Sequence, residues 1–315
     1  MKKFKFLSKL LAVLVIVPAI LLCTACGGGQ LASEAKVDTR GNWEKATTVT
    51  AAEFEEFKSS LAEDKAALQK GFHITQKASA MGSKMNTNAY FVFGEDSTKN
   101  QIAMKYEVEE PAEEEGEEPT KMSYTMYAKE NHLYLENLDF SMGLETERTD
   151  LKYNVDIDLS KNYSALGEEY TFLTYFFQSM LEGIDGQNGI ANVIAEFEAT
   201  AGDNEVVIKK IENGSTVKYQ LTINAQTLKE DFGFGEVDIA VEKAEAYLIF
   251  KNGAFNGAAI NMVGKVEVGE TTETVEQTFA ITSFEGEINF PDFKNYMGLP
   301  EVVGDIAKKT LEEVL

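Results

Sequence analysis

The chain has 315 residues, and its 44% hydrophobic content and 20 Phe are too high for a disordered polymer. Its 52 acidic residues outnumber its 29 Lys and Arg, which gives a net charge of −23. Because such a charge repels polyanions, we expect a folded body and no nucleic-acid partner.

The first 25 residues predict an export signal. Lys2, Lys3, Lys5 and Lys9 form a basic start without acidic residues, and a run without polar residues follows over residues 10–22. This run is shorter than the ~20 apolar residues of a membrane-spanning helix, and a proline interrupts it, so we expect cleavage. Removal of the four lysines leaves 25 basic against 52 acidic residues, a net charge of −27.

The segment around Cys26 resembles the lipobox of bacterial lipoproteins. Two small residues, Thr24 and Ala25, precede this cysteine, and Cys23 occupies the position that is usually Leu. The resemblance implies that Cys26 carries acyl chains such as palmitate and becomes the mature N-terminus. It would then anchor the chain to the cell membrane on the extracytoplasmic face, while Cys23 leaves with the signal. The alternative is an ordinary cleaved signal in which Cys26 is incidental.

Residues 26–50 predict a tether between the anchor and the body. Three glycines open this segment and small polar residues follow, a composition typical of flexible linkers. Trp43 is the only Trp, and it either docks on the body or dips toward the membrane interface. The predicted organisation is a signal over 1–25, the tether over 26–50 and a single β-rich domain over 51–315.

The body is predicted to open with an amphipathic helix. Thr50 and Glu53 have the spacing of a capping box, Phe54 and Phe57 begin an apolar face, and Gly71 follows as a stop. A helix with one apolar face is expected to cover an apolar surface.

Most of the remaining chain is predicted to form strands. Residues 151–159 alternate apolar and polar side chains, and similar runs recur along the chain. Asn213-Gly214 and Asn252-Gly253 are signals of two-residue hairpin turns. The pattern indicates a long antiparallel sheet with one face buried and the other solvated.

Two helical patterns interrupt the strands. They lie over residues 168–181 and 190–199, and the glycine-rich loop between them predicts a helical hairpin. A last helix is expected over residues 299–315, with Pro300 in its first turn. The fold class is therefore α+β, with an N-terminal helix, a long antiparallel sheet, a mid-chain helical hairpin and a C-terminal helix.

This order of elements behind a lipid anchor resembles the half-barrel lipoproteins, which include Lol-type carriers of lipoproteins and mycobacterial lipid-carrier lipoproteins. The resemblance covers residues 51 to about 298. It implies a strongly curved sheet, with the helical hairpin on its concave face and an apolar cavity for acyl chains. The candidate cavity-lining residues lie on one face of the first hairpin helix: Phe172, Leu173, Phe176, Phe177, Met180 and Leu181. A stripe of this kind forms ordinary core more often than it lines a ligand site.

The sequence contains no pattern that indicates catalysis or metal binding. His73 and His132 have no Cys, His or paired acid at metal-ligand spacing, and neither a nucleophile elbow nor a phosphate-binding loop occurs. Asp156, Asp158 and Ser160 alternate as expected for the outer face of a strand. We therefore expect no cofactor, no metal and no enzymatic activity.

Two functions remain open at this point. The first is a carrier that holds a lipid or another apolar ligand inside the half-barrel. The second is a non-catalytic surface module that binds a protein or a cell-wall partner. Glutamates crowd residues 107–118, but the prolines and glycine among them predict a solvated loop rather than a binding site.

Overall fold

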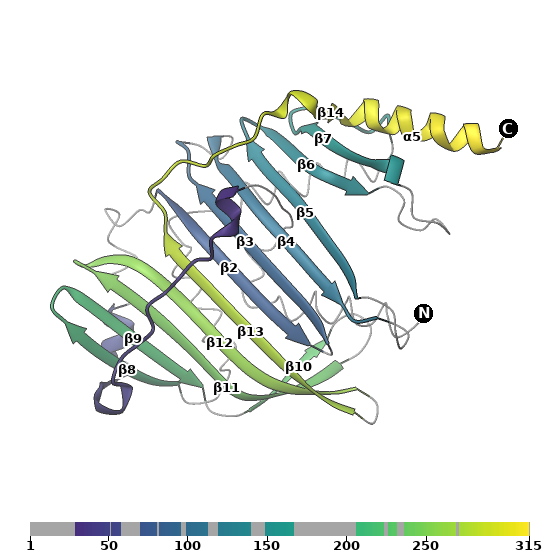
Figure 1. The fold of residues 1–315 in the computed structure, drawn as a ribbon. Helices are drawn as coiled ribbons and strands as arrows, with labels where there is room; N and C mark the ends of the chain where they lie inside the picture. Colours follow the sequence, from purple (N-terminus) through teal and green to yellow (C-terminus); the bar gives the residue numbers. More distant parts are fainter. Residues whose placement is uncertain are drawn as a thin grey trace.

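The computed structural model describes residues 29–50, 52–57, 70–80, 82–95, 99–112, 119–139, 149–166, 206–223, 226–231, 236–268 and 271–314. In this part of the chain, 14 strands form one sheet in the order β1-β8-β9-β11-β12-β13-β2-β3-β4-β5-β6-β7-β14, with β10 paired to β11 (Figure 1). The strands are β1 (Thr47–Val49), β2 (Gly71–Ala80), β3 (Ser83–Val92), β4 (Gln101–Glu110), β5 (Thr120–Lys129), β6 (His132–Asp139), β7 (Lys152–Asp158), β8 (Val206–Asn213), β9 (Thr216–Ile223), β10 (Gln226–Asp231), β11 (Glu236–Lys251), β12 (Ala254–Val268), β13 (Thr271–Ser283) and β14 (Met297–Gly298). The helices are η2 (Gly29–Ala32), η3 (Trp43–Lys45), η6 (Thr149–Leu151), η7 (Phe293–Asn295) and α5 (Leu299–Val314).

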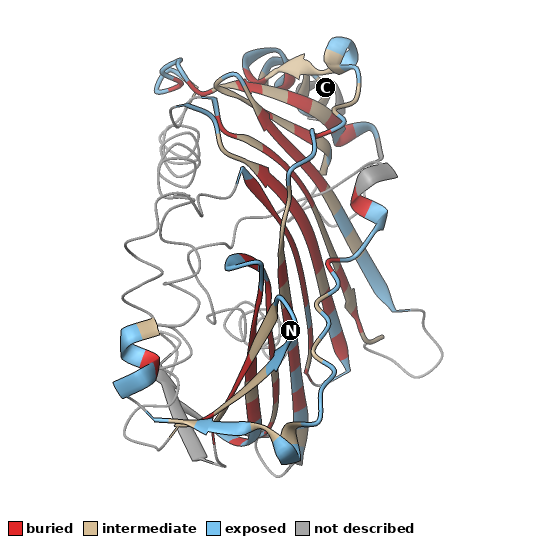
Figure 2. Ribbon diagram, turned by 90° about the vertical axis from the view of Figure 1, so that its left-hand side faces the viewer, coloured by how far each residue is buried: buried red, intermediate tan, exposed pale blue. Residues whose placement is uncertain are grey.

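The predicted antiparallel sheet is confirmed. Neighbouring strands of the described sheet run antiparallel, except that β14 pairs parallel with β7. Between β11 and β12, Asn252 and Gly253 have φ angles of 54° and 80°, and Gly214 has 59° between β8 and β9. Left-handed residues in a short turn match the twist of hairpin strands. The resulting sheet is open and curved, like half of a barrel (Figure 2).

The two faces of the sheet carry different side chains. We call inner the face that bears the main hydrophobic core, represented by Ile74, Met104 and Leu221. The outer face is the opposite one, and residues 31–49 and 284–296 cross it. Buried positions alternate with less buried ones along β7, as the two-residue period of a strand requires, whereas the first six residues of β2 are all buried.

The described start of the N-terminal helix agrees with the prediction. Residues 52–57 are helical, and the capping box forms in both directions. The backbone N–H of Thr50 donates to the Glu53 carboxylate at 2.8 Å, and the backbone N–H of Glu53 donates to the Thr50 hydroxyl at 3.3 Å. Phe57 stacks on Tyr219 with ring centroids 4.5 Å apart, so the apolar face of this turn packs on the inner face of the sheet.

The predicted C-terminal helix is also confirmed as α5. Its Val302 is fully buried, and the Tyr153 hydroxyl of β7 donates to the Asp305 carboxylate at 2.8 Å. The Lys309 ammonium in turn donates to the Tyr153 hydroxyl at 3.0 Å. These contacts hold α5 against the end of the sheet formed by β7 and β14. The predicted helical hairpin lies outside the described residues.

Residues 31–49 lie across the outer face of the sheet, and we call this segment the N-terminal strap (Figure 1). The Asn88 amide of β3 donates to the main-chain carbonyls of Leu31 and Ser33, at 2.6 Å in both cases. At the other end of the strap, β1 pairs with β8 at the edge of the sheet. The strap is therefore bound to the sheet where the composition suggested a free tether. Its main-chain carbonyls provide many of these contacts, and composition does not reveal them.

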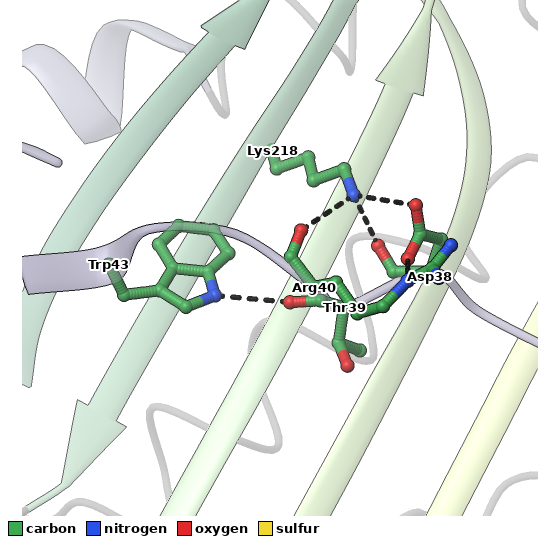
Figure 3. Close-up of polar contacts among 5 residues, drawn as sticks. All are labelled: Asp38, Thr39, Arg40, Trp43 and Lys218. Atoms are coloured by element: carbon green, nitrogen blue, oxygen red, sulfur yellow. Dashed lines mark hydrogen bonds and ion pairs between the residues drawn. The ribbon is translucent and has the colours of Figure 1, made fainter.

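The second half of the strap is held by Lys218 and Trp43 (Figure 3). The Lys218 ammonium of β9 donates to the carbonyls of Asp38 at 2.6 Å and Arg40 at 2.9 Å. The Trp43 ring packs on Tyr247 of β11, with centroids 5.8 Å apart. Of the two alternatives for Trp43, the structure therefore has it docked on the body.

Candidate functional site

The inner face of β2 to β5 is organised in rows of side chains that cross the four strands. Residues paired across antiparallel strands lie side by side, and successive rows on one face are about 6.8 Å apart. The rows, from one end of the four strands to the other, are the rim row (Ala80, Ser83, Glu110, Thr120), the methionine row (Ala78, Met85, Val108, Met122), the polar row (Gln76, Thr87, Tyr106, Tyr124) and two apolar rows (Ile74, Ala89, Met104, Met126; Phe72, Phe91, Ile102, Ala128).

The two apolar rows form a continuous wall on the inner face, near the start of β2 and the end of β3. All of their side chains are buried and belong to the main core. Met104 and Met126 lie side by side in this wall, and Met side chains adapt readily to the shape of an apolar neighbour. The wall therefore offers no hydrogen-bonding group to a molecule that packs against it.

The polar row interrupts this apolar surface. Gln76 and Thr87 are cross-strand neighbours with exposed fractions of only 3% and 7%. Within the described part of the chain, Nε2 of Gln76 and Oγ1 of Thr87 reach no hydrogen-bond partner. Buried polar groups are nearly always paired, and an unpaired one costs roughly 1–3 kcal/mol. The polar row is therefore the part of the inner face that most requires an explanation.

Two tyrosines continue the polar row. Tyr106 lies opposite Thr87, and its ring is 6.5 Å from that of Tyr124. Burial raises the pKa of Tyr106 to about 12, with smaller contributions from Tyr124 and Glu110. The Tyr124 hydroxyl donates to the Met122 sulfur at 3.6 Å, a weak contact. With Tyr106 held neutral, the row presents uncharged polar groups rather than an ionised one.

The rim row places a carboxyl group at the end of the same surface. Glu110 is 5% exposed, and burial raises the pKa of its carboxyl above the ordinary value. Ser83 is fully buried at the start of β3, and its hydroxyl has no partner among the described residues. The rim and polar rows flank the methionine row, so polar and apolar bands alternate toward the strand ends.

The site residues predicted from the sequence lie outside the described part of the chain, and they stay predictions: Cys26, Phe172, Leu173, Phe176, Phe177, Met180 and Leu181. The sequence analysis did not find the polar row. A usable signal was present, because Gln76 stands between Ile74 and Ala78 at an inward position of an alternating strand. Periodicity alone identifies the inward positions of a strand, and the polar side chain at one of them is the additional signal.

The two histidines lie on the outer face, away from the polar row. His132 Nδ1 is 2.7 Å from the Asp156 carboxylate, a pairing that the sequence analysis did not foresee. His73 Nε2 is 2.8 Å from the Asn88 side-chain oxygen, and burial lowers the pKa of this histidine. His73 therefore supports the amide that holds the strap. Among the described residues, no group of three His, Cys, Asp or Glu could hold a metal ion.

A second concave feature lies on the outer face of β2 to β5. It is a hollow of about 740 Å³ with equal numbers of basic and acidic lining residues: Lys77, Lys84, Lys121, Glu107, Glu109 and Glu276. Lys84 and Lys121 both pair with Glu109, at 3.3 Å and 3.0 Å. Because these charges neutralise each other at the surface, the hollow has no strong electrostatic preference for a partner.

No protein-family model and no curated protein matches the chain. Among solved structures, the S-type phycobiliprotein lyase CPES from Guillardia theta overlaps 74% of this chain and 94% of its own, with 9% sequence identity and a TM-score of 0.19. A TM-score this low carries no argument about the fold or the function of the chain. The helices in the described ranges include none with the length and hydropathy to cross a bilayer.

Proposed function

We propose that this chain is a non-catalytic carrier that binds a lipid or another apolar molecule against the inner face of its half-barrel-like sheet. The observation that carries the proposal is the buried polar row, which lies between apolar rows and contains two groups without a hydrogen-bond partner in the described part of the chain. A folded chain gains nothing from such groups on its own, because each destabilises the unliganded state. A bound molecule with a matching polar group removes that cost and packs its apolar part on the rows beside it.

The proposal includes attachment to the extracytoplasmic face of the cell membrane through a lipid on Cys26. Each buried methylene of an acyl chain contributes about 0.8 kcal/mol, so two or more chains give stable anchoring. The strap adds a geometric consequence to this proposal. Leu31 is five residues after Cys26 and is already bound to the sheet, so the anchor lies at most roughly 18 Å from the body. The body would then sit close to the headgroups, where an apolar ligand is available.

Native mass spectrometry of the purified full chain with Cys26→Ala tests the carrier function. Extraction without detergent should leave a co-purifying apolar molecule on the protein, visible as a mass that organic solvent removes. A chain that is repeatedly free of any such mass, and that takes up no lipid from vesicles, would contradict the proposal. Fatty-acid labelling tests the anchor separately, because wild type should incorporate label and the Cys26→Ala variant should not.

The alternative is a surface module that binds a protein or cell-wall partner. The observation in its favour is the open hollow on the outer face, which is large enough for a side chain or a sugar. Crosslinking in the native cell would reveal such a partner, and the adduct would map to Lys77, Lys84 or Lys121. The carrier is the better-supported function because five of the six charged side chains that line the hollow form ion pairs, whereas Gln76 and Thr87 have polar atoms without a partner among the described residues.

A further inference from the structure

We propose that Gln76 and Thr87 recognise the carbonyl of an uncharged acyl ester, or of a chemically similar group, within the apolar ligand. This inference rests on the proposed carrier function and names the ligand class for the same site. The carbonyl would accept hydrogen bonds from Gln76 Nε2 and from the Thr87 hydroxyl, the two groups of the polar row that have no partner among the described residues. Three lines of observation on the inner face support this assignment.

The first line is the position and chemistry of the two groups. Gln76 on β2 and Thr87 on β3 are direct cross-strand partners, so their side chains leave the sheet next to each other on the same face. A side-chain amide nitrogen can only donate, and a hydroxyl can donate as well as accept. The pair therefore fits a ligand atom that accepts two hydrogen bonds, as a carbonyl oxygen does with its two lone pairs.

The second line is the location of the polar row between apolar rows. The methionine row lies on one side of it and the two apolar rows on the other, with about 6.8 Å between rows. If the polar group of the ligand were at one end, binding of that group to the polar row would place the apolar chain against only one of the two apolar surfaces. The other apolar surface would then have no apolar part of the ligand against it. An ester within a molecule has apolar chain on both sides, and this matches the order apolar, polar, apolar along the strands.

The third line is charge. None of the 20 residues in the five rows is Lys, Arg or His, and the one ionisable carboxyl group, that of Glu110, is acidic. A carboxylate or phosphate buried among these rows would lose its hydration without gaining a positive partner, which is costly. The whole chain also carries a net charge of −23. This part of the inner face, over β2 to β5, therefore favours a neutral ligand over a fatty-acid anion.

Binding of three matched probes to the full chain with Cys26→Ala tests this inference. The probes are a pyrene-labelled fatty acid, its methyl ester and the pyrene-labelled alkane of equal chain length. We expect the ester to bind more tightly than both the acid and the alkane. Each lost hydrogen bond should weaken ester binding about 3- to 10-fold, so Gln76→Met and Thr87→Val should each have this effect while alkane binding stays within about twofold.

Thermal unfolding without ligand provides the second measurement, with matched control variants. Thr75 and Gln220 are as buried as their counterparts, 6% and 7% exposed, but both lie on the outer face and both are hydrogen-bonded. Thr75 accepts from the Ala35 backbone at 2.7 Å, and Gln220 donates to Glu245 and Tyr247, both at 3.1 Å. Thr75→Val and Gln220→Met should lower Tm, whereas Thr87→Val and Gln76→Met should leave it unchanged or raise it.

The possible outcomes separate the inference from the proposed function. If the ester has no advantage over the alkane, or keeps it in the variant with both Gln76→Met and Thr87→Val, the carbonyl assignment is wrong although the carrier function stands. If no probe binds, the carrier function itself fails. If Thr87→Val lowers Tm as much as Thr75→Val does, the polar row is paired within the chain, and the inference is overturned whatever the probes do.

Discussion

Lys218 donates a hydrogen bond to the main-chain carbonyl of Asp38 at 2.6 Å, and this contact joins β9 to a segment 180 residues away in sequence. The same ammonium also reaches the Asp38 carboxylate at 3.0 Å. Hydrogen bonds from Arg40 and Lys218 hold the pKa of the Asp38 carboxyl well below its usual range. The side chain of Lys218 is largely buried beneath the strap, so its loss would leave strap carbonyls without a donor.

We predict that Lys218→Met releases the middle of the strap and destabilises the chain by roughly 1.5–3 kcal/mol, the scale for hydrogen bonds with a charged donor. Trp43 reports the release directly, because it is the only Trp and lies on the strap. Its fluorescence emission should shift to longer wavelength as the ring leaves Tyr247. Lys294→Met is the control, since Lys294 pairs only with the exposed Asp292 among its described contacts, and it should change neither measurement.

The parts of the fold that could be predicted from the sequence are those encoded by near neighbours. Thr50 and Glu53 specify a helix start within one turn, and Asn252-Gly253 specifies a hairpin within two residues. Local rules of this kind need no knowledge of the tertiary structure. They predicted the start of the N-terminal helix, the hairpin turns and the antiparallel character of the sheet.

The strap and the polar row could not be derived by the same rules. Residues of the strap bind the sheet mainly through main-chain carbonyls, which every residue type carries. Gln76 and Thr87 are brought together only by the register of β2 and β3, and that register decides which side chains share a row. Periodicity in the sequence indicates where the strands lie, but it does not show which side chains become neighbours across two strands.

Substitution of glycine by alanine is predicted to lower the stability of the chain at one position and to raise it at another. A Cβ at Gly257 of β12 would lie 2.9 Å from the Ile281 carbonyl oxygen and 3.2 Å from a methyl group of Val37 on the strap. Gly257→Ala should therefore destabilise the chain by about 1–3 kcal/mol, the range for overpacking. Gly304 of α5 has no heavy atom within 4 Å of such a Cβ, so Gly304→Ala should stabilise the chain by about 0.5–1 kcal/mol. Urea unfolding of both variants measures the difference.

Tyr153 links α5 to the sheet, and Tyr153→Phe should loosen this contact. The substitution removes the hydroxyl that donates to Asp305 and accepts from Lys309, at a cost of roughly 1 kcal/mol. Hydrogen exchange should speed up in α5 and not in β2 or β3. A variant in which exchange rises evenly across the sheet would contradict the view that this hydroxyl acts locally.

Glu110 gives the inner face a pH dependence of defined sign. Burial raises the pKa of its carboxyl above the ordinary value of 4.5, so the folded chain holds this proton more tightly than the unfolded chain does. Its contribution to stability is therefore greatest below pH 4.5 and is lost as the pH rises through the folded pKa. The Glu110→Gln variant has an uncharged amide at this position at every pH, so it does not incur the cost of burying an ionised carboxylate. Relative to wild type, it should be more stable at about pH 7.5 and lose this advantage toward about pH 3.5.

Glu109 is a control for this prediction on the opposite face of the same strand. Hydrogen bonds from Lys121 and then Lys84 lower the pKa of its carboxyl, so its contribution is present above the unfolded pKa and is lost as the pH falls. Glu109→Gln should thus be less stable than wild type at about pH 7.5, with the deficit vanishing toward about pH 3.5. Both substitutions remove one negative charge. Opposite pH profiles of stability in the two variants therefore cannot be caused by the change in net charge. Parallel profiles in the two variants would show that Glu110 is hydrated rather than buried on the inner face.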